Sequence, residues 1–277
     1  MADAMLIESV IVHGLTYRYW VQPGAAGSTY VAIPGGPGLN HSLFRPAFEA
    51  LAGTVIYLDS PGSGLNREQT DLSAYQEHWL DALQAILALH GPAIVLAHSA
   101  GCHTAFLLAE RLPSRVGGIV CISPVLGGPK SLQRYFSARG NALAKNLVQQ
   151  LWIEKRPECL AAYFAQVVPE LDPTPLPQQW LEKVDFNLDV FFSGVDFVSD
   201  MPIRHLVSHC QAPVVCYIGA RDPLNYEIKA EQALGELCEW VHCARSGHNI
   251  MLTEPERLLA GIKEFAGRVN CYEFSSS

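Results

Sequence analysis

Residues 93–112 read AIVLAHSAGCHTAFLLAERL, and the pattern changes at Ser99. The first five residues form a short apolar run, which is typical of a strand covered on both faces in a parallel sheet. After Ser99 the apolar residues recur at helical spacing as far as Leu112, and Pro113 ends the pattern. The stretch therefore predicts a strand, a sharp turn that carries Ser99, and a helix.

The same strand pattern recurs along the chain. Short apolar runs lie at residues 30–34, 54–58, 118–122 and 213–218, and residues 9–22 predict two strands joined by a turn. Such runs are continuously apolar, whereas a strand with one face in water alternates apolar and polar residues. Most of these strands are therefore expected to lie inside a parallel sheet.

Helical stripes lie between these runs. One covers residues 71–90, and the last begins with a capping box, Thr253 and Glu256, and continues to Phe265. A chain that alternates strands and helices folds as a doubly wound sheet. We therefore predict an α/β fold with a mostly parallel central sheet flanked by helices.

Residues 125–208 interrupt this alternation. They contain no convincing strand, are helical in character, and include a Pro-rich stretch at 169–177. The segment is rich in aromatic residues: Tyr135, Phe136, Trp152, Tyr163, Phe164, Trp180, Phe186, Phe191, Phe192 and Phe197. We predict that residues 125–208 form a helical lid, or cap domain, over the carboxyl ends of the strands. Residues 1–124 and 209–277 would then form the core.

The turn at Ser99 has the features of a nucleophile elbow. A serine on a sharp strand-to-helix turn has its hydroxyl lifted clear of the sheet, at the positive end of the following helix. Such a turn needs small residues two positions before and two positions after the serine, and Ala97 and Gly101 are small. The alternative is a serine that only caps a helix.

An acid and a histidine follow Ser99 in the chain. Asp222 comes directly after the apolar run 213–218, and His248 follows a short predicted strand at 240–243. The order serine, acid, histidine is that of a known catalytic triad. We predict that Ser99 is the nucleophile, that His248 accepts its proton, and that Asp222 orients the imidazole.

A glycine-rich loop, PGGPG at residues 34–38, follows the strand at 30–34. Glycines let backbone N–H groups face a reacting carbonyl. We predict an oxyanion hole made by the N–H groups of Gly36 and Ala100. A phosphate-binding loop is the alternative, but the sequence lacks the Lys-Ser/Thr ending and the GxGxxG spacing.

Four further residues are candidates for substrate contact. Gly35 lies in the glycine loop, Trp152 lies in the predicted lid, and His41 and His98 fall near the expected pocket. For the two histidines the alternative is a hydrogen-bonded structural role.

The composition argues mildly against several partners. Twenty-seven acidic and nineteen basic residues give a net charge of −8, and no Lys/Arg cluster favours nucleic acid or an anionic membrane. No apolar run approaches the roughly 18 to 20 residues of a membrane span. The N-terminus has no signal-peptide pattern, so we expect a cytoplasmic protein. The eight cysteines lack CxxC spacing, so we expect free thiols and no metal site.

Taken together, the sequence resembles α/β-hydrolases of the proline iminopeptidase type and related esterases and lactonases. The motifs that carry the resemblance are GGPG at 35–38, DSPGSG at 59–64, and the residues Ser99, Asp222 and His248. The resemblance implies an α/β-hydrolase fold, no cofactor, and an acyl-enzyme formed on the serine. It also implies that Asp59 is a structural residue of its turn.

The sequence departs from that family at two positions. Pro34 stands where the glycine loop usually begins with His, and Pro61 stands where the Asp turn usually carries Arg. Peptidase members hold the free amine of the substrate with acidic lid residues. The candidates for that role in this chain are Glu154, Glu158, Glu170 and Glu182.

The predicted function is a serine hydrolase that acts on an ester, lactone, thioester or amide of a largely apolar small molecule. The same triad could instead serve acyl transfer, cyclisation or a lyase step, because the lid decides whether water reaches the acyl-enzyme. A third alternative is a ligand-binding protein without catalysis. Epoxide hydrolases and haloalkane dehalogenases need Asp at the elbow, so Ser99 excludes them. Nothing in the sequence indicates an oligomeric state.

Overall fold

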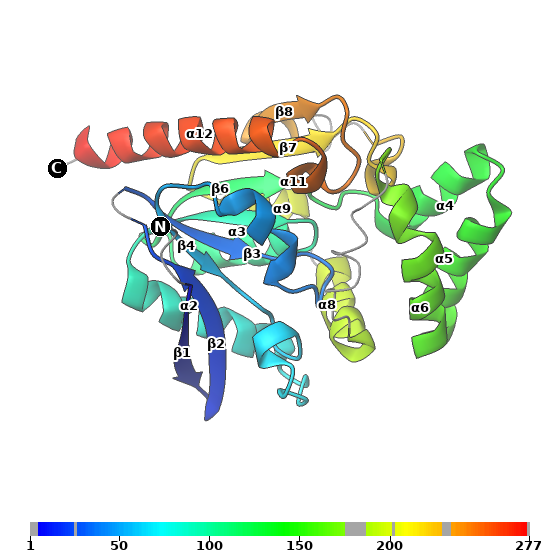
Figure 1. Ribbon diagram of the computed structural model, residues 1–277, viewed down its shortest axis with the longest axis horizontal. Coiled ribbons are helices and arrows are strands. Elements are labelled where there is room, and N and C mark those ends of the chain that lie inside the picture. The colour runs from blue at the N-terminus through cyan, green and yellow to red at the C-terminus, as the bar shows by residue number, and fades with distance from the viewer. Residues whose placement is uncertain (1–4, 25–26, 175–186, 201–202, 229–233, 276–277) are drawn as a thin grey trace.

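The computed structural model describes residues 5–24, 27–174, 187–200, 203–228 and 234–275. In these residues an eight-stranded sheet has the order β1-β2-β4-β3-β5-β6-β7-β8 (Figure 1). The strands are β1 (Leu6–Val12), β2 (Leu15–Gln22), β3 (Thr29–Ile33), β4 (Thr54–Tyr57), β5 (Ala93–His98), β6 (Val116–Ile122), β7 (Val214–Gly219) and β8 (Glu239–Cys243). The β1–β2 and β2–β4 pairs are antiparallel, and the pairs from β4 through β8 are parallel. The predicted α/β fold with a mostly parallel sheet is therefore confirmed.

The two-strand start also has the predicted turn. His13 and Gly14 connect β1 to β2, and both have positive φ angles, 52° and 76°. A two-residue turn of this kind matches the twist of the strands that it joins. β1 begins at Leu6, a few residues earlier than the sequence indicated.

The central strands are apolar on both faces because each face meets a different core. In β3, Tyr30 and Ala32 belong to one buried cluster, and Val31 and Ile33 belong to the other. This is the period of two that a pleated strand imposes. It explains why the runs read from the sequence have no polar alternation.

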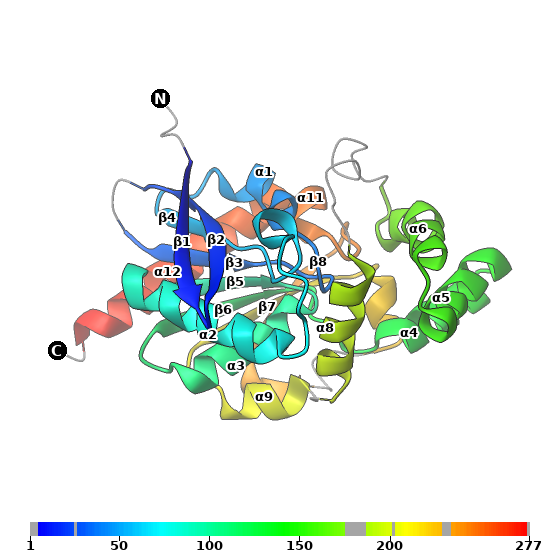
Figure 2. The ribbon, with the colours of Figure 1, turned by 90° about the horizontal axis from the view of Figure 1, so that it is seen from below.

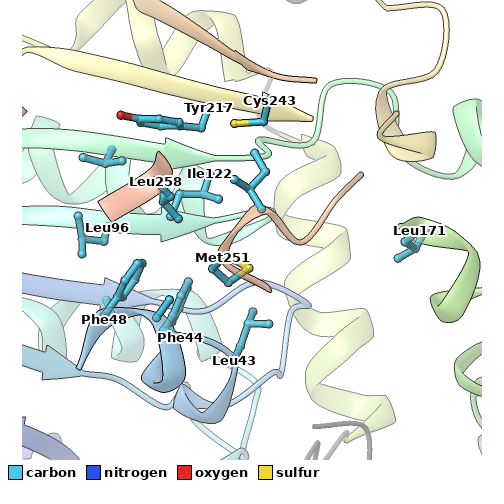
Figure 3. Packing of buried hydrophobic residues seen from close by; sticks show 14 of the residues in the cluster. Leu43, Phe44, Phe48, Leu96, Ile122, Leu171, Tyr217, Cys243, Met251 and Leu258 are labelled. Carbon is cyan, nitrogen blue, oxygen red and sulfur yellow. The ribbon is translucent and has the colours of Figure 1, made fainter. Parts of the chain in front are cut away.

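Helices cover the two faces of the sheet (Figure 2). On one face lie α2 (Tyr75–His90), α3 (Gly101–Arg111) and α9 (Ile203–His209), whose buried residues share one cluster. On the other lie α1 (Arg45–Phe48), α11 (Ile250–Thr253) and α12 (Pro255–Ser275). Figure 3 shows this second core, where Phe44, Phe48, Met251 and Leu258 pack against Leu96 and Ile122 of the sheet.

In the described residues, the chain between β6 and β7 forms helices joined by loops, and no strand. It contains α4 (Gly128–Ala138), α5 (Ala142–Glu154), α6 (Pro157–Gln166), the short 3-10 helix η3 (Val168–Leu171), α8 (Leu188–Asp200) and α9. In both views α4, α5 and α6 stand apart from the sheet, beyond the ends to which the strand arrows point (Figures 1 and 2). We call residues 128–172 the helical insertion.

The predicted division into core and lid is only partly visible in this arrangement. Within the range 125–208, Ile203, Leu206 and Val207 are buried in the cluster beneath α2 and α3. Trp180, Glu182 and Phe186 lie outside the described residues, as does the side chain of Phe197. A lid function for residues 125–208 stays a prediction.

The described helices contain no stretch that is both long enough and apolar enough to cross a membrane.

Candidate active site

Ser99 occupies a tight turn between β5 and α3. Its φ angle is +54°, a conformation that costs a non-glycine residue about 1–3 kcal/mol. The backbone N–H of Ser99 donates to the carbonyl of Ile122 at the end of β6 (2.9 Å). The neighbours must be small, because a Cβ on Gly101 would lie 2.6 Å from the carbonyl oxygen of Pro34. The turn thus has the strain and close packing that the sequence predicts for an elbow.

The structure brings Ser99, His248 and Asp222 together. The hydroxyl of Ser99 donates to Nε2 of His248 (2.9 Å), and Nδ1–H of His248 donates to Oδ2 of Asp222 (3.0 Å). The three residues are 4%, 4% and 6% exposed, so water does not compete for these bonds. The Nδ1 bond leaves Nε2 with a free lone pair, which is the form that can accept a proton from serine.

The electrostatics of His248 favour that role. Burial by itself lowers the pKa of His248, but the adjacent carboxylate of Asp222 outweighs burial through its charge and its hydrogen bond. The charge of Asp172 acts in the same direction, and the net result is a pKa above the ordinary 6.5. His248 is therefore a stronger base than a free histidine.

Asp222 is held by a neighbour that sequence reasoning missed. Its Oδ2 accepts from Asn225 Nδ2 (2.9 Å), and its Oδ1 accepts from the N–H of Leu224 (2.9 Å). Asn225 also donates to the carbonyl of Pro124 (2.9 Å), which follows β6. The side chain of Asn225 therefore fixes the acid loop to the adjacent strand end. The sequence signal for this role is an Asn that lies in a turn, three residues after Asp222.

The glycine loop and Ala100 lie beside Ser99. A Cβ on Gly35 would be 2.7 Å from Cβ of Ser99, so only glycine lets this loop approach the elbow. Gly36 has a φ angle of +112° and lines the same cavity as Ser99. In the described part of the chain, the N–H groups of Gly36 and Ala100 have no hydrogen-bond acceptor. Both groups are thus available to a ligand, as the predicted oxyanion hole requires.

A cavity of about 70 Å³ opens at Ser99 and His248. Its lining, from both core and insertion, comprises Gly36, Leu39, His98, Ser99, Tyr163, Phe164, Val168, Leu171, Phe191, Leu224, His248 and Asn249. Most of these side chains are apolar, as is usual for small-molecule sites. Trp152 does not line the cavity, but its ring lies 6.1 Å from that of Tyr163 and 5.6 Å from that of Phe191. The ring of Trp152 thus supports the cavity wall, and its contact with substrate stays a prediction.

The two histidine candidates have different environments. His98 lines the cavity, and its Nε2–H donates to the carbonyl of His248 (3.1 Å). Burial, together with the nearby His248, lowers the pKa of His98 well below 6.5, so it is neutral. The other, His41, does not reach the cavity lining; its ring and backbone N–H bind the buried carboxylate of Asp59. The Asp59 turn thus engages the ring of His41, and its contact with substrate stays a prediction.

Of the acidic residues considered for an amine site, the three that the structure describes do not line the cavity. Glu154, Glu158 and Glu170 are exposed, and Glu154 pairs with Arg156. Glu182 lies outside the described residues. These positions offer no support for peptidase specificity.

The seven cysteines whose side chains the structure describes are free thiols. Contrary to the expectation that the sequence has no HxxxH spacing, His205 and His209 have it on α9, and their ring centroids are 4.3 Å apart. Within the described ranges, however, no group of three or more His, Cys, Asp or Glu side chains could hold a metal ion.

A model of the alpha/beta hydrolase family matches residues 10–261, and the chain belongs to this family. No curated protein sequence matches it significantly. A loop variant of a haloalkane dehalogenase from Bradyrhizobium elkanii superposes with a TM-score of 0.72 and 15% identity, over 99% of this chain and 100% of the other. A thermophilic esterase from Thermogutta terrifontis gives a TM-score of 0.67 and 16% identity, over 96% and 99%. At such identities the likeness shows the common fold, and function must be argued from the site.

Proposed function

We propose that this protein is a serine hydrolase that cleaves an ester, lactone, thioester or amide bond of a largely apolar small molecule. The observation that carries the proposal is the hydrogen-bonded series Ser99–His248–Asp222 at a strained elbow, with distances of 2.9 and 3.0 Å. The members lie on three separate strand ends, as a nucleophile, a base and an orienting acid do in such enzymes.

The first half of the reaction forms an acyl-enzyme. His248 takes the hydroxyl proton at Nε2 as Oγ of Ser99 attacks the carbonyl carbon of the substrate. The carbonyl oxygen becomes an oxyanion, and the N–H groups of Gly36 and Ala100 donate to it. When the intermediate collapses, the bond to the leaving group breaks and the imidazolium of His248 returns the proton to that group. Asp222 stabilises the imidazolium throughout.

The second half releases the acid. A water molecule gives one proton to His248 and attacks the acyl carbon, and collapse of the second intermediate returns that proton to Oγ of Ser99. The sum is the addition of one water across the scissile bond. No cofactor is required for these steps.

The cavity supports a compact apolar acyl group as the substrate portion near Ser99. A water molecule needs roughly 10–15 Å³ of such space, so about 70 Å³ holds a short acyl chain and little more. Leu39, Phe164 and Phe191 supply apolar walls. The likeness to a haloalkane dehalogenase does not extend to its chemistry, because that reaction needs Asp where this chain has Ser99.

Labelling with a fluorophosphonate probe tests the nucleophile. Wild-type protein should be labelled, and Ser99→Ala should not be. Ser137→Ala is a matched control, because Ser137 lies exposed on α4 away from the cavity, and it should be labelled like the wild type. Unlabelled wild type, or equal labelling of Ser99→Ala, would overturn the proposal.

Product analysis separates hydrolysis from acyl transfer. A p-nitrophenyl ester of a short acid should yield the free acid in water. If an added alcohol or amine captures nearly all of the acyl group even when it is dilute, the enzyme is an acyl transferase and the hydrolytic part of the proposal is wrong.

A further inference from the structure

The end of the helical insertion lies against the loop that carries His248. The carbonyl of Leu171, the last residue of η3, accepts a hydrogen bond from the backbone N–H of His248 (2.9 Å). The next residue, Asp172, accepts two bonds from Asn249. Its Oδ1 accepts from the backbone N–H (3.1 Å), and its Oδ2 accepts from Nδ2 (2.6 Å).

This contact is buried and closely fitted. Asp172 is 8% exposed and Asn249 is 3% exposed. A Cβ on Gly247 would overlap the carbonyl oxygen of Leu171 and lie 2.8 Å from Cα of Asp172. Only glycine at position 247 therefore lets the two backbones come this close. A buried carboxylate is costly unless it is fully hydrogen-bonded, so the two bonds from Asn249 are what hold Asp172 there.

The core anchors a different part of the same loop. Glu254 accepts bonds from the N–H of Arg245 (2.9 Å) and from the hydroxyl of Ser246 (2.8 Å). Further along the loop, the N–H groups of His248 and Asn249 both donate to the insertion. The backbone of His248 is therefore held from two sides: its N–H donates to Leu171 of the insertion, and its carbonyl accepts from Nε2–H of His98 in the core.

We propose that Asp172 is a positioning residue: together with the Leu171 carbonyl, it holds the His248 loop in register with Ser99 and Asp222. This inference rests on the proposed function, and it adds a role for the insertion beyond that of a wall for the cavity. If residues 171 and 172 move away, two consecutive N–H groups lose their acceptors, and the imidazole is released from its alignment with the hydroxyl of Ser99.

Asp172 also acts on His248 through its charge. The groups that face His248 are the carboxylates of Asp222 and Asp172, the hydroxyl of Ser99 and the neutral ring of His98. The charge of Asp172 adds to that of Asp222 in raising the pKa of His248. A neutral residue at position 172 should therefore lower that pKa, a change that a merely structural role would not produce.

Asp172→Ala and Asp172→Asn test the proposal, with Glu170→Gln as the matched control. Glu170 is two residues away and exposed, so its substitution removes the same charge from the same segment without touching the loop. With a p-nitrophenyl ester, we expect kcat to fall about 10²-fold in Asp172→Ala, since a misplacement of about 1 Å costs that much. KM should change little. Asp172→Asn keeps one acceptor for the N–H of Asn249 and should retain intermediate activity.

Two readouts separate positioning from general damage. The acid limb of the pH profile of kcat/KM should move to lower pH in Asp172→Asn and stay unchanged in Glu170→Gln. Hydrogen–deuterium exchange in a peptide that covers residues 245–252 should accelerate in both Asp172 variants and stay at the wild-type rate in Glu170→Gln. If Asp172→Ala does not fold, Asp172→Asn provides both readouts.

The inference fails if folded Asp172 variants keep the wild-type kcat, acid limb and exchange rate. This failure is distinct from failure of the proposed function. Exchange needs no substrate, and labelling of wild-type Ser99 by the fluorophosphonate probe reports on the nucleophile independently.

Discussion

Glu254 in the core and Asp172 in the helical insertion are both buried carboxylates, and both accept hydrogen bonds from the loop that carries His248. Their electrostatic surroundings differ. Burial raises the pKa of Glu254, but bonds from Ser246 and Arg245 and nearby positive charge outweigh it, and the pKa is lowered. For Asp172, the effect of burial on the pKa is larger than that of the bonds from Asn249. The charge of Asp222 acts in the same direction as burial, so the pKa is raised.

The difference indicates two kinds of support. The Glu254 anchor from the core has a lowered pKa and holds the start of the loop at Arg245 and Ser246. The Asp172 anchor from the insertion has a raised pKa and holds Asn249, next to His248. A buried carboxylate with a raised pKa stays ionised only when neighbouring groups stabilise its charge. Groups with shifted pKa values are common at functional sites. The core should therefore dominate stability and the insertion should tune activity. Substitutions on each side can break or sharpen this contrast.

Removal of the imidazole should have the largest effect. His248→Ala takes away the base while leaving Glu254 and its bonds in place. We expect kcat/KM to fall about 10⁴-fold or more, since loss of one triad member leaves only binding and the oxyanion hole. The melting temperature should stay close to that of the wild type. A large loss of stability in this variant would contradict the view that the imidazole end of the loop contributes little to folding.

Glu254→Gln should damage stability more than chemistry. The substitution removes the charge that receives bonds from Ser246 and the N–H of Arg245, and bonds to a charged acceptor contribute about 1.5–3 kcal/mol. We expect the free energy of unfolding to fall by about 3 kcal/mol, measured with urea, and kcat to fall much less than in Asp172→Ala. A larger fall in kcat for Glu254→Gln than for Asp172→Ala would contradict the contrast between core and insertion.

Gly247→Ala probes the contact between the His248 loop and the helical insertion. The added methyl group overlaps the Leu171 carbonyl, so the loop and the insertion must separate. We expect a loss of about 2 kcal/mol in the free energy of unfolding, typical of overpacking, together with the faster hydrogen exchange expected for Asp172→Ala. Gly267→Ala is a control, because a Cβ there meets nothing within 4 Å. Unchanged hydrogen exchange in Gly247→Ala would show that the contact with the insertion does not hold the His248 loop.

The acid limb of the pH profile of activity should lie at a higher pH than the ordinary pKa of a histidine. His248 must be neutral to accept the proton of Ser99, and its pKa is raised above 6.5. Activity is therefore expected to fall as the pH drops through that raised pKa, as measured by kcat/KM between pH 5 and 9. An acid limb below 6.5 would mean that burial, and not the two carboxylates, controls the imidazole.

Short-range patterns were enough to predict the elbow and the order of its partners. A parallel sheet brings its strand ends to one edge, so Ser99 after β5, Asp222 after β7 and His248 after β8 could be expected to lie near one another. The pairing of Asp172 with Asn249 could not be read in this way. It joins residues far apart in the chain, and Asp172 lies in the Pro-rich stretch 169–177, where no periodicity places a side chain.

His41 shows the same limit at shorter range. Its position beside the glycine loop indicated the pocket, but its ring binds the buried carboxylate of Asp59, and His41 is not among the residues that line the cavity. The sequence places both residues at strand ends and does not determine which of their neighbours each side chain meets. Side-chain pairing in this site is therefore set by the three-dimensional fold and not by local sequence pattern.

The smallest expected effect concerns the pH dependence of stability. The pKa of Asp172 is raised in the folded protein, so the folded state binds more protons than the unfolded state between the ordinary pKa of 3.8 and the raised value. Across that window Asp172 makes stability decline as the pH rises, by at most about 1.4 kcal/mol per pH unit. Glu254, with its lowered pKa, contributes stability that is present above its ordinary pKa of 4.5 and is lost as the pH falls through the lowered value. Urea unfolding from pH 3 to 6 should therefore show opposite changes in slope for Asp172→Asn and Glu254→Gln relative to wild type. Changes of the same sign would mean that the two carboxylates support the His248 loop in the same way, and the contrast between core and insertion would be lost.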